Sequence, residues 1–163
     1  MIFSEQFFEQ SPYLCALMAV EIKNKKARYT YFLEDEFTAG MQLLGSEIKS
    51  IRAGKASIVE GYCKLKDNEL WIFNMYIAEY ENSGYVTHQP KRPRKLLLTK
   101  HEIEKLQKKM KNVGLTIVPL LCFIADTGFA KLNIAIAKGK KLHDKRSDLK
   151  DKSLKRDIDR AME

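Results

Sequence analysis

The sequence predicts a mainly β protein: a small antiparallel barrel of about six strands, with two or three short helices and a basic, partly disordered C-terminal tail. Short β-prone runs separated by turn signals predict the barrel, because strands joined by tight turns pair antiparallel. The length of 163 residues suits one folded domain. Residues 138–163 carry ten Lys/Arg and six Asp/Glu, too many charges for a buried core, which predicts the tail.

The start of the body predicts a strand, a short helix and a second strand. Residues 28–33 are rich in aromatic side chains and β-prone. A helix should follow, because the acids at 34–36 suit a first helical turn. Apolar residues then recur at helical spacing, namely Phe37, Met41 and Leu44. Gly45 is a natural helix stop, and residues 47–53 predict the next strand.

A hairpin is predicted in the middle of the chain. The turn signal at 54–55 precedes a short strand at 57–59. The runs 62–66 and 70–77 are β-prone and flank Asp67 and Asn68, a pair typical of a tight turn. We therefore expect these two runs to pair with each other.

Residues 82–95 predict a loop, since two prolines and a glycine interrupt regular structure. Thr99 and Glu102 have the spacing of a capping box and predict a helix that ends before Gly114. The apolar face of this helix comprises Ile103, Leu106 and Met110.

The last part of the body predicts two strands joined by a turn at 126–128. Residues 115–125 form a continuous apolar run with one proline, as expected for a strand covered on both faces and entered near an edge or bulge. Residues 129–137 alternate between apolar and polar, and Lys131 points off this otherwise buried strand.

Three parts are expected: a leader at 1–17, the barrel at 18–137 and the tail at 138–163. The apolar run at 12–20 lacks a basic flank and is too short for a secretory signal. We expect the leader to be either an appended segment or the product of an upstream start codon, with Met18 as the alternative start. No uncharged run approaches the roughly 18 residues of a membrane span.

The tail could form a helix, with a thin apolar stripe of Leu154, Ile158 and Met162. Its acid-before-base pairs contribute only about 0.2–0.5 kcal/mol each, so the isolated segment should stay frayed until a polyanion neutralises its cations. The alternative is a solvated extension that improves solubility.

Positive charge is concentrated in blocks, which is typical of a nucleic-acid-binding protein. The formal net charge is +8, and residues 23–28, 85–112 and 138–163 carry the excess. Anionic lipid or simple solubility are the alternatives. Arg can fork onto a phosphate or stack on a base, and Lys supplies a point charge, so a barrel lined this way can grip folded RNA.

The predicted RNA-binding surface consists of basic residues in turns, loops and strand ends. The set comprises Arg28, Lys49, Arg52, Lys55, Arg92, Arg94, Lys95, Lys131 and Lys138. A solvated basic face is the alternative, and Lys131 could be a structural accident.

No arrangement predicts a catalytic residue, a cofactor or a metal. Cys15, Cys63 and Cys122 lack the spacing of a zinc site or a disulfide framework, which fits a reducing cytoplasm. The acids at 34–36 could bind a divalent ion, but consecutive residues point around a helix start and rarely converge. The three histidines lie in basic or loop-like segments and read as surface or RNA-contacting rings: His88, His101 and His143.

Four segments resemble one bacterial family. They are N-K-K-A-R-Y-T-Y-F-L at 24–33, A-G-M-Q-L-L-G-S-E-I-K-S-I-R-A-G-K at 39–55, R-K-L-L-L at 94–98 and A-K-G-K-K-L-H-D-K-R-S-D at 137–148. Their order and combination closely resemble the small protein B (SmpB) family, the partner of transfer-messenger RNA (tmRNA). The resemblance runs over residues 18–163 and leaves the leader out.

The resemblance implies a six-stranded barrel of the oligonucleotide-binding (OB-fold) type and a non-enzymatic role in trans-translation. The expected partners are the tRNA-like domain of tmRNA and the ribosome, including small-subunit rRNA, with the tail in the decoding centre and the empty message channel. We expect a cytoplasmic monomer without cofactor, membrane or small-molecule substrate. The alternative is a general RNA-binding or ribosome-associated OB-fold protein.

Individual roles carry over by position. Lys131 resembles a phosphate-contacting residue and Leu97 one whose packing shapes the RNA surface. The tail residues implied to act in the ribosome are Gly139, Lys140, Lys141, His143, Asp144, Lys145 and Arg146. Of these, His143 is implied to stack on rRNA. Thr38 departs from the usual family Glu, so the contact made by that acid is absent or supplied differently.

Overall fold

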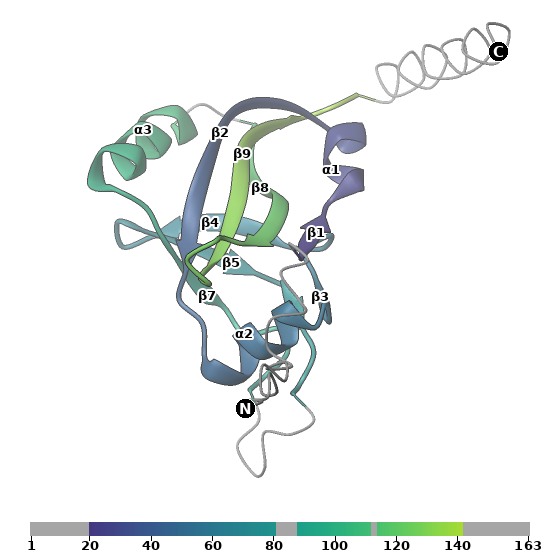
Figure 1. Ribbon diagram of the computed structural model, residues 1–163. Coiled ribbons are helices and arrows are strands. Elements are labelled where there is room, and N and C mark those ends of the chain that lie inside the picture. The colour runs from purple at the N-terminus through teal and green to yellow at the C-terminus, as the bar shows by residue number, and fades with distance from the viewer. Residues whose placement is uncertain (1–19, 81–87, 112–113, 142–163) are drawn as a thin grey trace, which may run out of the picture.

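The computed structural model describes residues 20–80, 88–111 and 114–141, and six strands close into an antiparallel barrel (Figure 1). The order around the ring is β8, β4, β5, β7, β2 and β9, and β9 pairs back onto β8. The strands are β1 (Glu21–Lys23), β2 (Tyr31–Met41), β3 (Ala56–Ser57), β4 (Tyr62–Lys66), β5 (Glu69–Phe73), β6 (Tyr76–Ile77), β7 (Arg94–Leu97), β8 (Leu115–Ile124) and β9 (Ala130–Gly139). β1 lies beside β8, while β3 and β6 form a separate ribbon. The predicted six-stranded antiparallel barrel is confirmed; the tail from residue 142 onward lies outside the described residues.

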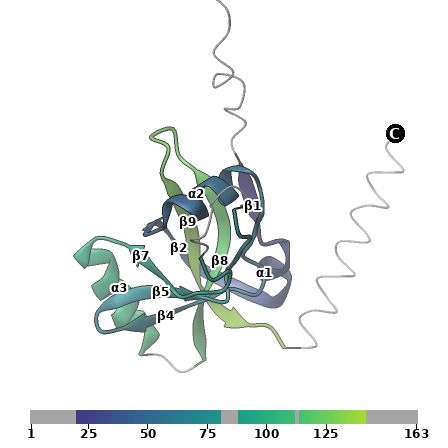
Figure 2. The ribbon, with the colours of Figure 1, turned by 90° about the horizontal axis from the view of Figure 1, so that it is seen from below.

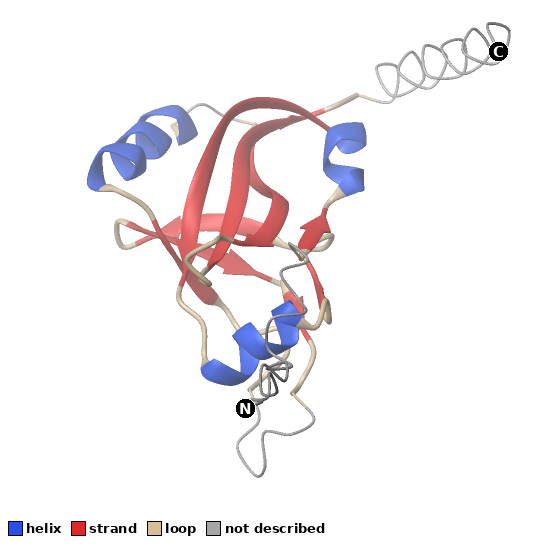
Figure 3. Ribbon diagram, viewed as in Figure 1, coloured by secondary structure: helices blue, strands red, loops and turns tan. Residues whose placement is uncertain are grey.

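The helices of the described ranges are α1 (Lys25–Thr30), α2 (Gly45–Arg52) and α3 (Lys100–Met110), and they surround the barrel (Figure 3). Ile51 of α2 and Leu106 of α3 are fully buried in the main core. Figure 2 shows that these two helices lie well apart on the barrel. Ala27 of α1 instead packs with Val118 and Ala137 in a second, smaller cluster. α1 is therefore seated on the outside of β8 and β9.

Alternation of side chains along the strands builds the core. In β5, Leu70 and Ile72 are fully buried between half-buried neighbours, and in β9 Leu132 and Ile134 alternate with half-buried polar residues. The other large, fully buried aliphatic residues of the core are Ile51, Ile58, Ile77, Leu96, Leu106, Ile117 and Ile136. Ala137 is buried on the opposite face, where its small side chain lets α1 approach.

Several local predictions are confirmed. Asp67 and Asn68 have positive φ of 51° and 60° and form the tight turn between β4 and β5. Thr99 caps α3, with its backbone N–H donating to the Glu102 carboxylate at 2.9 Å. The β8 register shifts just after Pro119, as the proline in that apolar run predicted.

The predicted helix after residues 34–36 is wrong, because β2 continues through it as a strand paired with β9. Phe37 and Ala39 are buried on one face, while Glu36 and Thr38 are exposed on the other. Phe37 fits both the helical spacing and this alternation with period two. Residues 36–39 form a strand because they pair with β9, which is distant in sequence.

One predicted strand is helical, and another is helical in its first half. The run 28–33 begins inside α1, which Asn24 caps, and enters β2 at Tyr31. Residues 47–52 of the run 47–53 belong to α2. The Glu47 carboxylate accepts a hydrogen bond of 2.8 Å from the backbone N–H just before α2 and so satisfies one of the donors left free at a helix start. Gly45 consequently begins a helix instead of ending one.

The predicted strand at 70–77 is interrupted at Asn74, whose φ of 57° separates β5 from β6. The predicted loop at 82–95 is shorter than expected, since its last two residues already belong to β7. The first difference shortens a predicted strand and the second extends regular structure into a predicted loop, and neither changes the order of the barrel strands.

Candidate nucleic-acid interface

α1 presents basic side chains from a fixed base. Asn24, only 8% exposed, donates its side-chain amide to the backbone carbonyl of Pro119 at 3.1 Å, and its backbone N–H donates to Leu120 at 2.8 Å. These bonds attach the start of α1 to β8. The exposed cations of this helix are Lys25, Lys26 and Arg28. Arg28 was predicted; its two neighbours were not.

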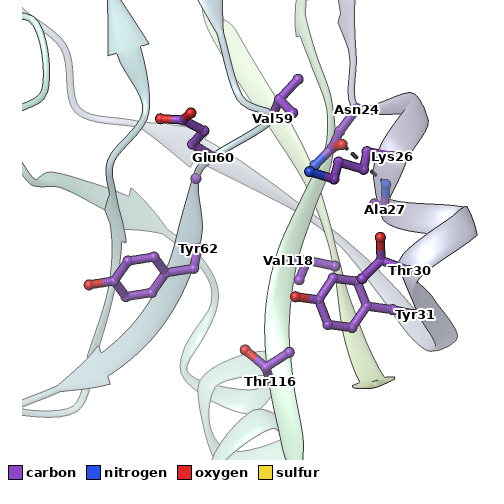
Figure 4. Close-up of a pocket in the computed structure, with 11 residues that line it drawn as sticks. Asn24, Lys26, Ala27, Thr30, Tyr31, Val59, Glu60, Tyr62, Thr116 and Val118 are labelled. Carbon is purple, nitrogen blue, oxygen red and sulfur yellow. Dashed lines mark hydrogen bonds between the residues drawn. The ribbon is translucent and has the colours of Figure 1, made fainter. Parts of the chain in front are cut away.

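A hollow of about 430 Å³ lies between α1 and the segment 59–62, and we call it the tyrosine hollow. Its lining includes Lys26, Thr30, Tyr31, Tyr62, Thr116 and Val118. Figure 4 shows the two tyrosine rings on opposite sides of the hollow, with Thr30 and Thr116 near Tyr31. Tyr62 is 44% exposed and stacks on Phe73 at a centroid distance of 5.5 Å.

The chemistry of the tyrosine hollow suits an unpaired base. Aromatic rings offer stacking faces to any base, hydroxyl groups can both donate and accept, and Lys26 can meet a phosphate. Sequence reasoning missed Tyr31 and Tyr62, because both lie in predicted strands, where an aromatic residue more often packs in the core. A tyrosine on a barrel strand was the available signal. Only solvent exposure distinguishes a tyrosine that can contact a ligand from one that packs in the core, and the sequence does not give exposure.

A second hollow, of about 310 Å³, lies on the other side of α1. Cations of α1 and a residue of β9 line it together. Its lining is Lys23, Asn24, Lys25, Arg28, Glu36, Leu120, Leu121 and Asn133. α1 therefore separates two depressions, with Lys26 at one and Arg28 at the other. We call the two hollows and α1 together the α1 face.

β9 extends this face with a polar row. Thr38 donates its hydroxyl to the side-chain carbonyl of Asn133 at 2.9 Å, so the residue that departs from the family pattern is bound to a neighbouring strand. One step further, Gly40 of β2 pairs with Lys131 on β9 and with Leu97 on β7. The two residues that were predicted from separate motifs therefore flank one glycine.

Leu97 and Lys131 differ in how far they reach solvent. Leu97 is 51% exposed, and a β-carbon on Gly40 would lie 3.5 Å from the Leu97 β-carbon. Lys131 is half-buried. The outer surface here combines an apolar side chain, an uncovered backbone and a cation, which together can receive a ribose and its phosphate.

α2 carries a further group of predicted cations at a different place on the barrel (Figure 1). Arg52 donates to the Gly128 carbonyl at 3.0 Å, which attaches α2 to the β8–β9 turn. The Lys49 ammonium lies 5.1 Å from the centre of the Tyr80 ring. With the exposed Lys55, this surface is basic but partly occupied by contacts within the protein.

The prediction that Arg94 contacts RNA is wrong for this structure, because its side chain is completely buried. Its guanidinium donates to Glu47 at 2.9 Å and to the carbonyls of Met75, Arg92 and Pro90 at 2.7 to 3.0 Å. Arg92, 28% exposed, also binds Glu47, at 2.6 Å. We call Glu47, Arg92 and Arg94 the carboxylate clasp, and it fastens α2 to the start of β7 and the residues just before it.

The electrostatics of the clasp keep both partners charged. Burial raises the pKa of Glu47, but hydrogen bonds from Arg92, from the Leu44 backbone and from Arg94 outweigh it, so the pKa lies below its usual value. Burial lowers the pKa of Arg94, and the charge of Glu47 opposes that shift. Lys95, another predicted contact, is ion-paired with Glu69. Arg92, Arg94 and Lys95 thus form ion pairs within the protein.

His88 is also not the surface ring that was predicted. It is 4% exposed, its Nε2 lies 3.3 Å from the Ile77 carbonyl and its Nδ1 lies 2.9 Å from the Ser46 hydroxyl. A carbonyl can only accept, so Nε2 donates to Ile77, while Nδ1 shares a hydrogen bond with the Ser46 hydroxyl. The ring therefore connects the start of α2 to β6.

The predicted tail residues are described only at their beginning. Lys138 and Gly139 are exposed at the end of β9, followed by Lys140 and Lys141. The remaining predicted residues, His143, Asp144, Lys145 and Arg146, lie outside the described residues.

The described part of the chain contains no group of three or more His, Cys, Asp or Glu residues placed to hold a metal. Cys63 and Cys122 are buried free thiols, and burial raises the pKa of Cys122 to about 12, so neither is a ready nucleophile. Among the same residues, no helix has the length and apolar character needed to cross a membrane.

Comparison with known proteins is consistent with these features. A family profile described as SmpB protein matches residues 21–163. An SsrA-binding protein of Christiangramia forsetii is 49% identical over 150 residues, which are 91% of this chain and 96% of the relative. An SsrA-binding protein of Bacteroides thetaiotaomicron is 52% identical over 142 residues, 87% of this chain and 95% of the relative.

A solved structure supports the same relationship. A chain from the structure described as "tmRNA-SmpB: a journey to the center of the bacterial ribosome" is 41% identical in sequence. It superposes with a TM-score of 0.64 over 76% of this chain and 87% of that chain.

Proposed function

The chain belongs to the SmpB protein family, and on that premise we propose that it binds the tRNA-like domain of tmRNA and accompanies it to stalled ribosomes in trans-translation. The observation that best supports the proposal is the α1 face. Its cations can neutralise phosphates while the tyrosine hollow accepts an unpaired base, so the face is suited to folded RNA with an exposed loop.

The direct test is binding of the full chain to the tRNA-like domain, measured by filter binding at several salt concentrations. We expect nanomolar-range affinity that falls linearly on a logarithmic salt scale, because each neutralised phosphate releases counterions. An unrelated hairpin RNA of equal length is the control. Equal affinity for that hairpin would contradict the proposal and favour a general RNA-binding barrel.

The segment from residue 138 onward is proposed to act in the ribosome, separately from RNA capture by the body. Deleting residues 139–163 should preserve affinity for the tRNA-like domain and abolish tagging of stalled chains in a reconstituted translation reaction. Loss of RNA affinity in the deletion would show that the two activities share one surface.

The proposed role needs binding and no turnover, with the cytoplasm as its location. tmRNA incubated with an excess of the protein should remain intact and unmodified, as judged by gel electrophoresis and mass spectrometry. Cleaved or modified RNA that depended on the protein would require an enzymatic activity instead.

A further inference from the structure

We propose that Lys140 is a positioning residue that fixes where the C-terminal segment leaves the barrel, by capping the C-terminal end of α1. This inference rests on the proposed function and deepens it, because it connects the RNA-binding body to the segment that acts in the ribosome. The family resemblance implied that Lys140 acts in the ribosome. The structure gives it bonds within the protein.

β9 carries the chain past the barrel to α1. Its last residues continue to pair with the start of β2, with Lys138 opposite Phe32 and Gly139 opposite Tyr31. Lys140 follows directly, and its backbone N–H donates to the Thr30 carbonyl at 3.0 Å. The backbone therefore holds the chain along the start of β2 at residues 138 and 139, and to the last residue of α1 at Lys140.

The Lys140 side chain adds two contacts at the same place. Its ammonium donates to the Arg28 carbonyl at 3.2 Å and lies 4.8 Å from the centre of the Phe32 ring. The last carbonyls of a helix have no partner within the helix and attract a positive charge. One residue thus satisfies two such carbonyls of α1, those of Arg28 and Thr30. The exposed ring of Phe32, 46% accessible, supports the cation from the side.

This arrangement joins two functional parts into one unit. α1 carries Lys25, Lys26 and Arg28, and Asn24 fixes its other end to β8. With Lys140 at its C-terminal end, α1 is held at both ends. RNA bound to the α1 face would therefore have a defined position relative to the chain exit.

The structural test uses NMR amide exchange on the full chain, with Lys140→Met and Phe32→Leu as disrupting variants. Lys140→Met keeps the backbone bond and the apolar stem but removes the charge, so exchange at residues 138–140 should accelerate roughly two- to ten-fold, the effect of one net hydrogen bond. Lys140→Arg should restore slow exchange, since a guanidinium can donate to the carbonyl and stack on the ring. Unchanged exchange in both disrupting variants would overturn the proposal.

The functional test separates this inference from the proposed function. Lys140→Met and Phe32→Leu should lower tagging of stalled chains, while Lys140→Arg should tag as the parent does. Lys108→Met, an exposed lysine on α3, is the matched control for loss of one charge and should tag normally. Affinity for the tRNA-like domain, measured in parallel, reports on the proposed function alone. Parent-level tagging by Lys140→Met would overturn the positioning role even if RNA binding is as proposed.

Discussion

α1 and α2 are both basic helices on the same barrel, yet they use charge in opposite ways. The cations of α1 point to solvent beside two hollows, and a polar residue, Asn24, attaches the helix to the barrel. At α2 the nearby arginines turn inward, and Arg94 is completely buried against Glu47. Positive charge near a helix therefore indicates a ligand surface only where the structure leaves that charge without an internal carboxylate.

Of the changes considered, removal of the carboxylate clasp should have the largest effect, and that effect is on the free energy of unfolding. Glu47→Ala leaves the Arg94 guanidinium buried without its carboxylate and should lower the free energy of unfolding by roughly 3–5 kcal/mol. Urea denaturation would measure the change. Glu60→Ala is the matched control, since Glu60 forms an exposed pair with Lys91 that contributes only about 0–1 kcal/mol. Similar stabilities of the two variants would contradict a structural role for the clasp.

Loss of a stacking ring should come next. Tyr62→Ala should weaken binding of the tRNA-like domain by about 1–3 kcal/mol, the range for one stacked base. Tyr76→Ala removes an equally exposed tyrosine, at 43%, from β6, outside the tyrosine hollow, and should bind as the parent does. Circular dichroism would verify that both variants are folded. Equal affinities would show that the hollow does not receive a base.

Loss of the phosphate contact proposed for Lys131 should have a smaller effect on affinity, and it should also change the salt dependence of binding. Lys131→Gln should weaken binding modestly and reduce the slope of the salt dependence by about one, as expected for one lost phosphate contact. Lys108→Gln on α3 should leave the slope unchanged. An unaltered slope in Lys131→Gln would mean that this lysine is structural.

The smallest expected effect is on the acid side of the stability profile. The pKa of Glu47 in the folded protein lies below its ordinary value of 4.5, so the ionised form is favoured by folding. Its stabilising contribution is present above pH 4.5 and is lost as the pH falls through the folded pKa. Urea denaturation between pH 6 and pH 3, the practical window around that value, should show a steeper decline for the parent than for Glu47→Gln. Parallel profiles for parent and variant would contradict the coupling.

Local signals predicted the fold where they were self-contained. The turn at Asp67 and Asn68 and the capping box of Thr99 and Glu102 depend on neighbouring residues, and both are present. β2 failed as a prediction because its identity depends on β9, about 95 residues away at the Thr38 and Asn133 contact. The eleven residues of β2 do not show by themselves which distant strand they pair with.

The candidate site was predicted in part for a related reason. Arg28 lies on the α1 face and Lys131 on the strand that extends it, whereas Arg94, which has the same charge, is buried. Sequence reports charge but not burial, and burial decides whether an arginine meets a ligand or a carboxylate. Tyr62 was missed by the converse error, since aromatic residues on strands suggest core.

NMR titration of the isotope-labelled full chain with the tRNA-like domain compares the two helices in one experiment. We expect the largest amide shifts at α1, at residues 59–62 and at Lys131 and Asn133, with little change at Arg92 and Arg94. Large shifts at the carboxylate clasp together with an unperturbed α1 would contradict this expectation.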